Sequence, residues 1–534
     1  MPSSLTYPGV YVEELPSGVR TITGVPTSLT AFVGRAWRGP LDDPIRINSY
    51  SDYERTFGGL WRGSTMSYAV QQFFSNGGSQ AIVVRVATRA GAGAAAAATI
   101  DLGGGNTLAA AFPGTWGRNL VVIVDHKVKT PADASLFNLT ILDDPNVATA
   151  ADSQKRGGSG AQEAFLNVSR DPLSARFVTK IIAQQSNLIR VTGVGAATPV
   201  DAAVRAGAAT GADGVSTTTV AAAAAEVTGD AVGKTGINAL RKTDIFNLLV
   251  IPPLTTSVTA TDTPTITNDV PMANWTDAAN LCKERRAFLI VDAPSDWTLA
   301  KAATDIGTFS AIERSYAGLY FPRIRIADPL QEGGLQDFAP SGVVAGIMSR
   351  TDAERGVWKA PAGLEAGLRG VMGLSINGLP ATLSDRENGD LNPIGVNCLR
   401  AFPNIGHVIW GARTLEGSDM LASQWKYTPV RRLALYIEES MFRGTQWVVF
   451  EPNDEPLWAQ IRLNLGAFMQ TLFRQGAFQG TTAKDAYLVK CDKETTTQDD
   501  INRGVVNILV GFAPLKPAEF VVIKIQQLAG QVQS

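Results

Sequence analysis

The sequence is poor in the side chains that most often carry metal or nucleophilic chemistry. It has two histidines, His126 and His407, and three cysteines, Cys282, Cys398 and Cys491, in 534 residues. Two histidines leave little material for a histidine metal site or a histidine general base. The cysteines are odd in number and far apart, which argues against a disulfide framework and favours buried free thiols.

A strong net charge and long apolar runs are also missing. The chain has 47 basic and 49 acidic residues, for a formal net charge of -2 at pH 7. This balance gives no overall signal for binding nucleic acid or a membrane surface. No apolar run is long enough to span a bilayer, and no charged-then-apolar leader opens the chain. We therefore expect no direct nucleic-acid binding, no membrane insertion and folding in a cytoplasm.

Two segments resemble nucleotide-binding motifs, but their spacing does not match. Residues Gly229 to Thr235 end in Gly-Lys-Thr, as a phosphate-binding loop does, but three residues rather than four follow the first glycine. Gly103-Gly104-Gly105 lacks the spacing of a dinucleotide-binding turn, and no serine lies in a G-x-S-x-G elbow. The sequence therefore predicts no cofactor.

Three carboxylates leave one enzymatic alternative open. Asp292, Asp296 and Asp305 lie near predicted strand ends, where α/β enzymes hold catalytic groups. Caps and turns use the same residue type at the same places. The sequence predicts no catalytic residue and no metal site, and an α/β enzyme with its site in residues 241–395 stays as the alternative.

The densest local signals lie between Arg431 and Glu519. Trp447 to Phe450 is a short apolar run that predicts a buried strand. Asn453 or Asp454 can cap a following helix, and Pro456 suits its first turn. The apolar positions of that helix share one face: Leu457, Ile461, Leu465, Phe468 and Leu472. Strands are predicted at Tyr487 to Val489 and at Gly504 to Phe512.

Both ends of the chain read as extended strands. Near the start, Val10, Tyr11 and Val12 form a short strand pattern. Near the end, the alternating run from Ala518 to Gln527 contains the apolar residues Phe520, Val521, Val522, Ile523 and Ile525. Exposed apolar edges promote aggregation unless they are paired. The two ends either pair within one monomer or pair between subunits of an assembly.

The composition divides the chain further. Residues 87–240 are rich in Ala, Gly, Thr and Val, with strand patterns at 120–124, 137–142, 177–182 and 188–191. We expect an α+β multidomain protein whose α/β core is built from N- and C-terminal parts, with an inserted, mostly β outer domain, an α/β middle domain and extended terminal strands. The expected segments are 1–20 (N-terminal arm), 21–86 (first part of the core), 87–240 (insert), 241–395 (middle domain), 396–515 (C-terminal core domain) and 516–534 (C-terminal arm).

Several short segments of the sequence resemble those of one known protein family. They are Pro8 to Glu14 (PGVYVEE), Trp410 to Leu415 (WGARTL), Phe450 to Asp454 (FEPND), Gly476 to Gly480 (GAFQG) and Val489 to Asp492 (VKCD). In this order and spacing they resemble the sheath proteins of contractile phage tails, R-type bacteriocins and related contractile injection systems. The resemblance covers residues near 7–90 and about 395–527, and hardly touches 87–240.

The resemblance implies a structural role. Sheath subunits of this family polymerise helically around an inner tube and contract without nucleotide hydrolysis to drive the tube through a cell envelope. The implied partners are further copies of the chain, an inner tube protein, and baseplate and tail-terminator proteins. Subunits would assemble in the bacterial cytoplasm and end in a virion tail or a released contractile particle.

The resemblance also implies which segments make contacts. The residues of inter-subunit strand exchange would be Val10, Tyr11, Val12, Phe520, Val521, Val522, Ile523 and Ile525. Arg462 and Arg474 on the predicted helix are candidates to face the tube, and an exposed helix charge is the alternative for both. The pair Arg431-Arg432 binds either an acidic partner or Glu438 or Glu439 of its own chain. A closed ring-forming interaction module is a further alternative.

Overall fold

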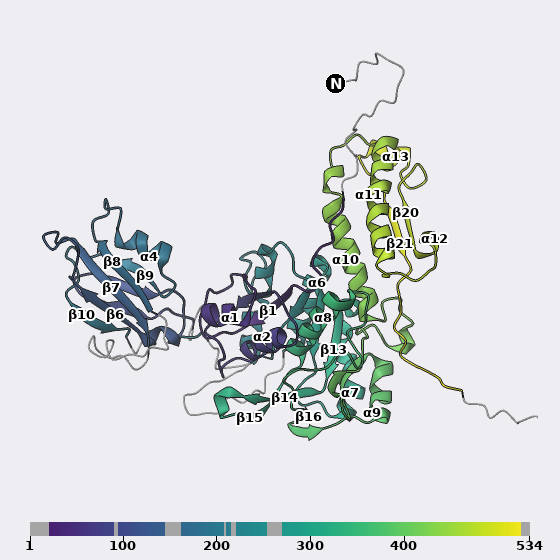
Figure 1. Cartoon of the computed structure of the whole chain (residues 1–534), viewed down its shortest axis with the longest axis horizontal. Coiled ribbons are helices and arrows are strands. Elements are labelled where there is room, and N and C mark those ends of the chain that lie inside the picture. The colour runs from purple at the N-terminus through teal and green to yellow at the C-terminus, as the bar shows by residue number, and fades with distance from the viewer. Residues whose placement is uncertain are drawn as a thin grey trace, which may run out of the picture. The chain divides into compact units, whose positions relative to one another are not determined.

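The structure is a computed structural model, and it describes residues 21–89, 94–144, 162–207, 210–214, 220–253 and 270–524. The chain divides into two compact units. One contains residues 28–354 and 361–428, and the other contains residues up to 27, 355–360 and those from 429 onward. The protein is a mixed α+β, multidomain chain (Figure 1).

The centre of the larger unit is an eight-stranded sheet. Its order is β19-β18-β13-β12-β11-β1-β3-β2. The strands from β18 to β3 run parallel, and β19 and β2 pair antiparallel at the two ends. In chain order the bounds are β1 Thr30–Gly34, β2 Ile45–Ile47, β3 Ala81–Arg85, β11 Leu248–Val250, β12 Phe288–Asp292, β13 Ala317–Phe321, β18 Val396–Phe402 and β19 Gly406–Ile409.

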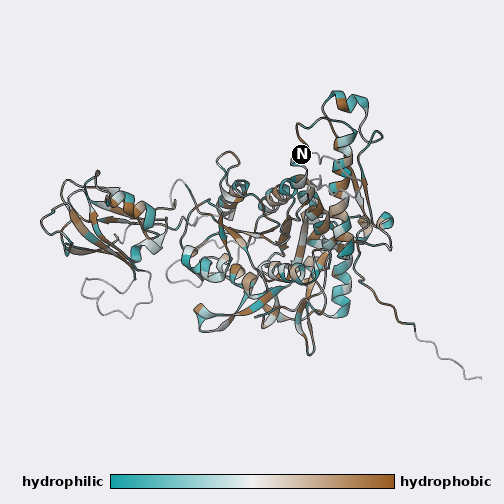
Figure 2. Ribbon diagram, turned by 45° about the horizontal axis from the view of Figure 1, so that its top comes forward, coloured by the Kyte–Doolittle hydropathy of each residue, from teal (hydrophilic) through white to brown (hydrophobic). Residues whose placement is uncertain are grey.

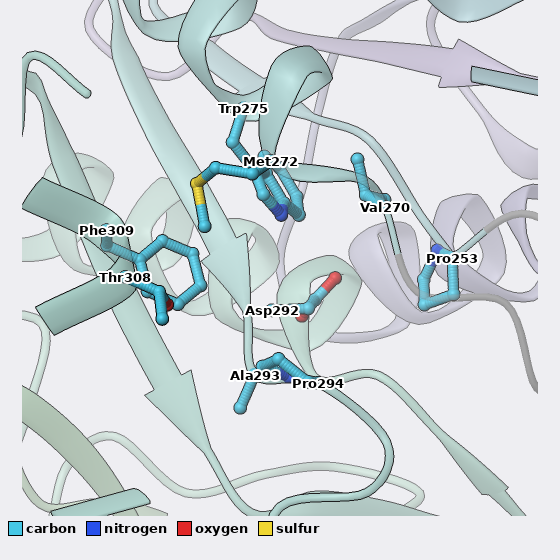
Figure 3. A pocket seen from close by; sticks show the side chains of 9 residues that line it. All are labelled: Pro253, Val270, Met272, Trp275, Asp292, Ala293, Pro294, Thr308 and Phe309. Carbon is cyan, nitrogen blue, oxygen red and sulfur yellow. The ribbon is translucent and has the colours of Figure 1, made fainter. Parts of the chain in front are cut away.

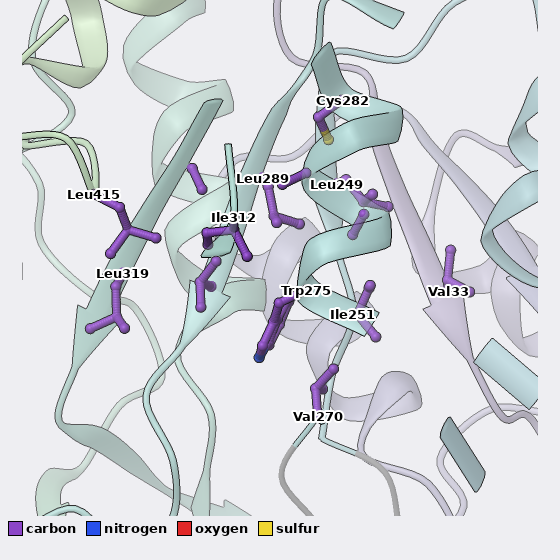
Figure 4. Packing of buried hydrophobic residues seen from close by; sticks show 14 of the residues in the cluster. Val33, Leu249, Ile251, Val270, Trp275, Cys282, Leu289, Ile312, Leu319 and Leu415 are labelled. Atoms are coloured by element: carbon purple, nitrogen blue, oxygen red, sulfur yellow. The ribbon is translucent and has the colours of Figure 1, made fainter. Parts of the chain in front are cut away.

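The parallel strands are buried, as their continuous apolar runs require. Val33, Leu249, Leu289 and Leu319 from four strands pack with Trp275 of α6 in one core cluster (Figure 4). Outside the insert, the α-helices in the described part of this unit are α1 Tyr50–Phe57, α2 Met66–Ser75, α5 Val220–Thr228, α6 Met272–Arg285, α7 Leu299–Asp305, α8 Ser341–Arg355 and α9 Asp385–Leu391. A smaller antiparallel sheet has the order β15-β14-β16-β17, with bounds Gly334–Phe338, Arg323–Asp328, Gly373–Ile376 and Leu379–Ala381.

The insert leaves the central sheet after β3 and returns before β11. It is mostly β, in two antiparallel sheets ordered β10-β6-β7-β8 and β4-β5-β9. Figure 2 shows its apolar residues concentrated on the strands. Its elements are β4 Thr99–Asp101, β5 Thr107–Ala110, β6 Leu120–Asp125, β7 Leu136–Asp143, β8 Gln162–Ser169, α4 Val178–Gln185, β9 Ile189–Gly193 and β10 Ala202–Arg205. The predicted strand at 177–182 is wrong, because Val178, Ile181 and Ile182 bury one face of α4.

The smaller unit is built on two helices and a hairpin. Its elements are α10 Thr428–Gly444, α11 Glu455–Arg474, α12 Ala483–Ala486, β20 Tyr487–Lys490, α13 Gln498–Asn502 and β21 Leu509–Phe512. The residues before β1 lie along α10: Val25 N–H donates to Ser440 Oγ at 3.2 Å. The close approach requires glycine at Gly24, where a Cβ would lie 2.0 Å from the Tyr436 hydroxyl.

The division of the chain differs from the one expected from the sequence. Strands from residues 30–85 and from the expected middle domain at 241–395 share one sheet, so neither forms a separate body. Of the expected C-terminal core domain, 396–409 joins that sheet, whereas residues from 429 onward belong to the other unit. The reason is physical: parallel strands cannot be joined by a tight turn, so strands that lie side by side come from distant parts of the chain.

Candidate functional site

A pocket lies at the carboxyl ends of β11 and β12, where an α/β enzyme would hold its site. It has a volume of about 170 Å³ and a mostly apolar lining (Figure 3). Asp292, the last residue of β12, is the carboxylate in it and is 4% exposed. Its Oδ1 accepts a hydrogen bond of 2.9 Å from the backbone N–H of Ser341, the first residue of α8. This hydrogen bond satisfies a backbone N–H at the first turn of α8, which has no partner within the helix. Asp292 therefore has a structural role.

The other two candidate carboxylates do not join Asp292. Asp296 is exposed and pairs with Lys301 Nζ. Asp305 ends α7, and its Oδ1 accepts a 2.8 Å hydrogen bond from Thr304 Oγ1. In the part of the chain that the structure describes, no three His, Cys, Asp or Glu side chains are grouped as a metal site would need. The three carboxylates thus form no shared site.

The loop that resembles a phosphate-binding motif is closed on itself. Asp230 accepts a hydrogen bond of 3.0 Å at its carbonyl from Thr235 N–H, and its carboxylate accepts from Gly233 N–H. Asp230 N–H in turn donates to Thr235 Oγ1 at 2.8 Å. These backbone groups bind one another and do not point together toward a ligand, as wrapping a phosphate requires.

The three thiols are buried, as predicted. Burial raises the pKa of Cys282, raises that of Cys398 to about 12 and raises that of Cys491 to about 11. The reactive thiolate form is therefore scarce at neutral pH. His407 is half-buried, and burial lowers its pKa. Neither residue type supplies an activated nucleophile or a poised base at these positions.

The paired arginines of α10 are structural. Arg431 and Arg432 are 4% and 3% exposed. Arg431 pairs with Glu438 at 3.6 Å, and Arg432 donates to the carbonyl of Thr27 at 3.0 Å. The second contact ties α10 to the segment that precedes β1. Of the two uses predicted for this pair, the salt bridge within the domain is the one observed.

Helix α11 is positioned as predicted. Asp454 is its N-cap and accepts a 3.2 Å hydrogen bond from Leu457 N–H. All five apolar positions named from the sequence are buried. Arg462 is held within its own unit, where it donates to Glu455 Oε1 at 2.6 Å and to the carbonyl of Cys491. Arg474 is exposed at the end of the helix. A tube-facing role stays a prediction for both arginines.

The structure describes only some of the terminal residues that the sequence predicts to exchange between subunits. Val10, Tyr11, Val12 and Ile525 lie outside the described residues. Phe520, Val521, Val522 and Ile523 are 74–81% exposed, and residues 518–524 have no strand partner among the described residues. Within the described residues, the β20-β21 sheet has two strands, paired antiparallel from Tyr487↔Phe512 to Lys490↔Leu509. Strand exchange stays a prediction.

One exposed feature was missed by sequence reasoning. The run Trp447 to Phe450 is not a buried strand: it contains the short helix η8 (Gln446–Val448), and Val449 and Phe450 are 62% and 102% exposed. Phe450 has φ +70°. An apolar run of four residues next to a turn signal does not reveal which side faces solvent.

Comparison with known proteins identifies the family. A model described as the phage tail sheath protein central domain matches residues 242–415. A model described as the phage tail sheath C-terminal domain matches residues 422–527. A search of curated protein sequences gives no match.

Solved structures with the same fold cover nearly the whole chain. The sheath complex of an extracellular contractile injection system, PVC, in its contracted state is 23% identical, covers 98% of each chain and has a TM-score of 0.56. The helical sheath of the anti-feeding prophage in its contracted state is 22% identical, with 98% of this chain and 100% of that chain covered and a TM-score of 0.56. A sheath tail protein from Listeria innocua is 13% identical, with 93% and 96% covered and a TM-score of 0.57.

The two family models together span most of the chain after the insert, including the central sheet from β12 to β19 and the C-terminal unit. The matched regions contain the four family-like segments that lie between Trp410 and Asp492. None of the candidate enzymatic features forms a catalytic arrangement in the described residues. The chain belongs to the phage tail sheath protein family.

Proposed function

We propose that this protein is the subunit of a contractile sheath, of which many copies polymerise helically around an inner tube. The observation that carries the proposal is the family match across 242–415 and 422–527. The similar solved structures are a sheath complex and a helical sheath, both in contracted states. The role is structural, without enzymatic activity, and the other partners are the tube, the baseplate and the tail terminator.

The proposed links between subunits are exchanged terminal strands. The exposed apolar residues Phe520 to Ile523 support this, because an exposed apolar segment tends to associate with another chain. The two-stranded β20-β21 sheet supports it as well, because two strands alone are marginal and extra strands stabilise them. Added strands would pair by their backbones, and residues 10–12 and 520–525 supply such strands.

The proposed contraction is a shift between two sets of subunit interfaces. Interfaces of packed elements are bistable rather than continuously deformable, so an extended array can store free energy and release it on triggering. The self-closed Gly229–Thr235 loop gives no reason to include a nucleotide in this cycle. Subunits would assemble in the bacterial cytoplasm before joining a tail or a released particle.

Electron microscopy of negatively stained protein tests the proposal. The full chain, expressed alone, is compared with a variant that lacks residues 1–20. We expect hollow tubes of regular diameter from the full chain and separate subunits from the truncated chain. Separate monomers from both chains would contradict the proposed sheath, and closed rings of fixed size would favour an interaction module instead. Tubes from both chains would contradict only the role of the N-terminal strand.

A further inference from the structure

The turn between α10 and α11, two helices labelled in Figure 1, contains an exposed aromatic residue and an exposed acidic residue. Phe450 is fully exposed, at 102% of its reference area. Glu451 is exposed beside it, and its carboxylate has no hydrogen bond or ion pair within the described part of this unit. The neighbouring acids differ, because Asp454 caps α11 and Glu455 binds Arg462. We name residues Phe450 and Glu451 the tip.

The backbone of the tip is strained at Phe450, the residue with the exposed ring. Phe450 has φ +70°, in the left-handed region that bulky side chains avoid. Residues held there carry an energetic cost and are concentrated at functional positions. Val449 before it is extended, at φ -65° and ψ 130°. A fully exposed aromatic residue gains nothing within its own unit that would offset this strain.

A groove in the other unit offers exposed aliphatic side chains and two guanidinium groups. It has a volume of about 430 Å³ and lies between the end of α8, residues 364–371 and the turn between β18 and β19. Leu364 and Ile405, on its lining, are 53% and 46% exposed. Two arginines also line it, Arg350 and Arg369. The groove therefore combines open aliphatic surface with cationic groups.

Neither arginine forms a salt bridge with another described residue. Arg350 donates to backbone carbonyls only, those of Asn76 at 3.2 Å and Gly367 at 2.8 Å among them. The Arg369 side chain is exposed, with no salt bridge to any described residue. The pKa of Arg350 is lowered by burial and then by the like charge of Arg369.

Two glutamates and a histidine also line the groove. Glu354 also lies on α8, but its effect on the pKa of Arg350 is smaller than that of Arg369. Glu365 lines the groove as well and has another polar interaction of its own. Burial lowers the pKa of His407, so this histidine adds no positive charge at neutral pH. The groove thus holds two guanidinium groups and two carboxylates, and neither arginine forms a salt bridge with a described residue.

We propose that the tip of one subunit docks in the Arg350–Arg369 groove of a second copy of this chain. The Glu451 carboxylate would bridge the two guanidinium groups, a pairing favoured by their planar donors. The Phe450 ring would cover Leu364 and Ile405 and lie within reach of an arginine face. Both partners of the contact lack a complement in their own unit, and each supplies what the other needs.

A contact of this kind suits a helical assembly, and in this respect the proposal rests on the proposed function. The tip and the groove are different surfaces, so the interface is heterologous. A heterologous interface leaves one tip and one groove open at the two ends and propagates without closure unless the rotation forms a ring. Each subunit in the interior of such an array would make the contact twice, once with its tip and once with its groove.

Cross-linking between two single-cysteine variants tests the contact. Val449→Cys lies next to the tip, and Met372→Cys lies next to the groove without lining it. The three native cysteines are buried, so a bismaleimide reacts with the introduced thiols. The two variants are mixed under assembly conditions, so that only an intermolecular contact joins them. The control pairs Val449→Cys with Met420→Cys, because Met420 is 96% exposed and Met372 is 66% exposed.

Charge exchange tests the chemistry of the same contact. With the two cysteines in place, Glu451→Arg or Arg369→Glu alone should lower the cross-linked yield about fivefold, the upper range for an exposed pair. Combining Glu451→Arg on one variant with Arg369→Glu on the other should restore most of that yield. Arg386→Glu is the matched control, because Arg386 is an exposed arginine of the same unit, on α9.

The outcomes separate this proposal from the proposed function. A cross-link well above the Met420 control that responds to charge exchange supports docking of the tip. Regular tubes without that cross-link overturn the docking proposal and leave the sheath function intact. A cross-linked pair without tubes supports the contact and counts against the helical sheath. A yield that does not change on charge reversal overturns the arginine–glutamate pairing.

Discussion

At the scale of single residues, burial decides the chemistry of the thiols. Cys398 is fully buried in β18, and the pKa of its thiol rises to about 12 because an anion there would lose its hydration. The guanidinium of Arg400 lowers the pKa only in part. A thiol with a raised pKa in the folded state contributes stability that is full below the pKa of the unfolded chain. That contribution is lost as pH rises toward the folded value.

This predicts a pH dependence that can be assigned to one residue. Relative to Cys398→Ala, the native chain should lose about 1.4 kcal/mol of its free energy of unfolding for each pH unit above about 9. Urea denaturation of both chains at pH 7, 9 and 10 measures the difference. The native chain should also resist thiol reagents at pH 8 until it is unfolded. Parallel pH profiles for the two chains would contradict the prediction.

At the scale of elements, regular local signals predicted structure well where the chain packs on one side. Helix α11 follows its apolar spacing and its cap, because the periodicity of a helix is set by the face it buries. The same reasoning failed at 447–450 and at 177–182. Short apolar runs fit a strand, a buried helix face or an exposed turn equally well. Tertiary contacts decide among these, as the core of the insert does for α4.

The turn before α11 allows strain and docking to be separated. Replacing Phe450 with glycine removes the penalty of φ +70° and, since the ring is exposed, removes no contact of the isolated subunit. We expect Phe450→Gly to raise the free energy of unfolding by about 1 kcal/mol. Denaturation of the unassembled protein measures this.

The matched control for Phe450→Gly is Val449→Gly, which replaces an exposed residue with an ordinary extended backbone. Glycine there only increases the freedom of the unfolded chain, so this variant should be slightly destabilised. If Phe450→Gly were destabilised to the same extent, the φ of Phe450 would not be a source of strain. Faster or tighter assembly of Phe450→Gly would count against docking of the ring.

At the scale of the whole molecule, sequence reasoning identified the family and the fold class but not the partition of the chain. The pairing of β1 with both β3 and β11 joins residues 30–34 to strands about 50 and 220 positions away along the chain. No local pattern encodes which buried strand lies beside which. The insert was recognisable because its composition differs, and a composition change marks a boundary without naming the neighbours on each side.

The C-terminal segment gives the last prediction, because it distinguishes a strand that serves its own subunit from one that serves another. Residues 518–524 have no ladder partner in the described chain, and Phe520 to Ile523 are exposed. Removing residues 516–534 should therefore change the free energy of unfolding of the separate subunit by less than about 0.5 kcal/mol, as for other surface changes. The same truncation should prevent tube formation.

Replacing Phe520, Val521, Val522 and Ile523 with serine in the full chain is the matched variant, since it keeps the backbone and removes the apolar faces. If backbone pairing gives most of the link, this variant still assembles, more weakly than the native chain. A truncated subunit that unfolds much more easily would instead place the segment within its own monomer. Exchange between subunits would then be untenable for this end of the chain. A strand that is already paired within its own subunit has no unpaired edge with which another subunit could pair.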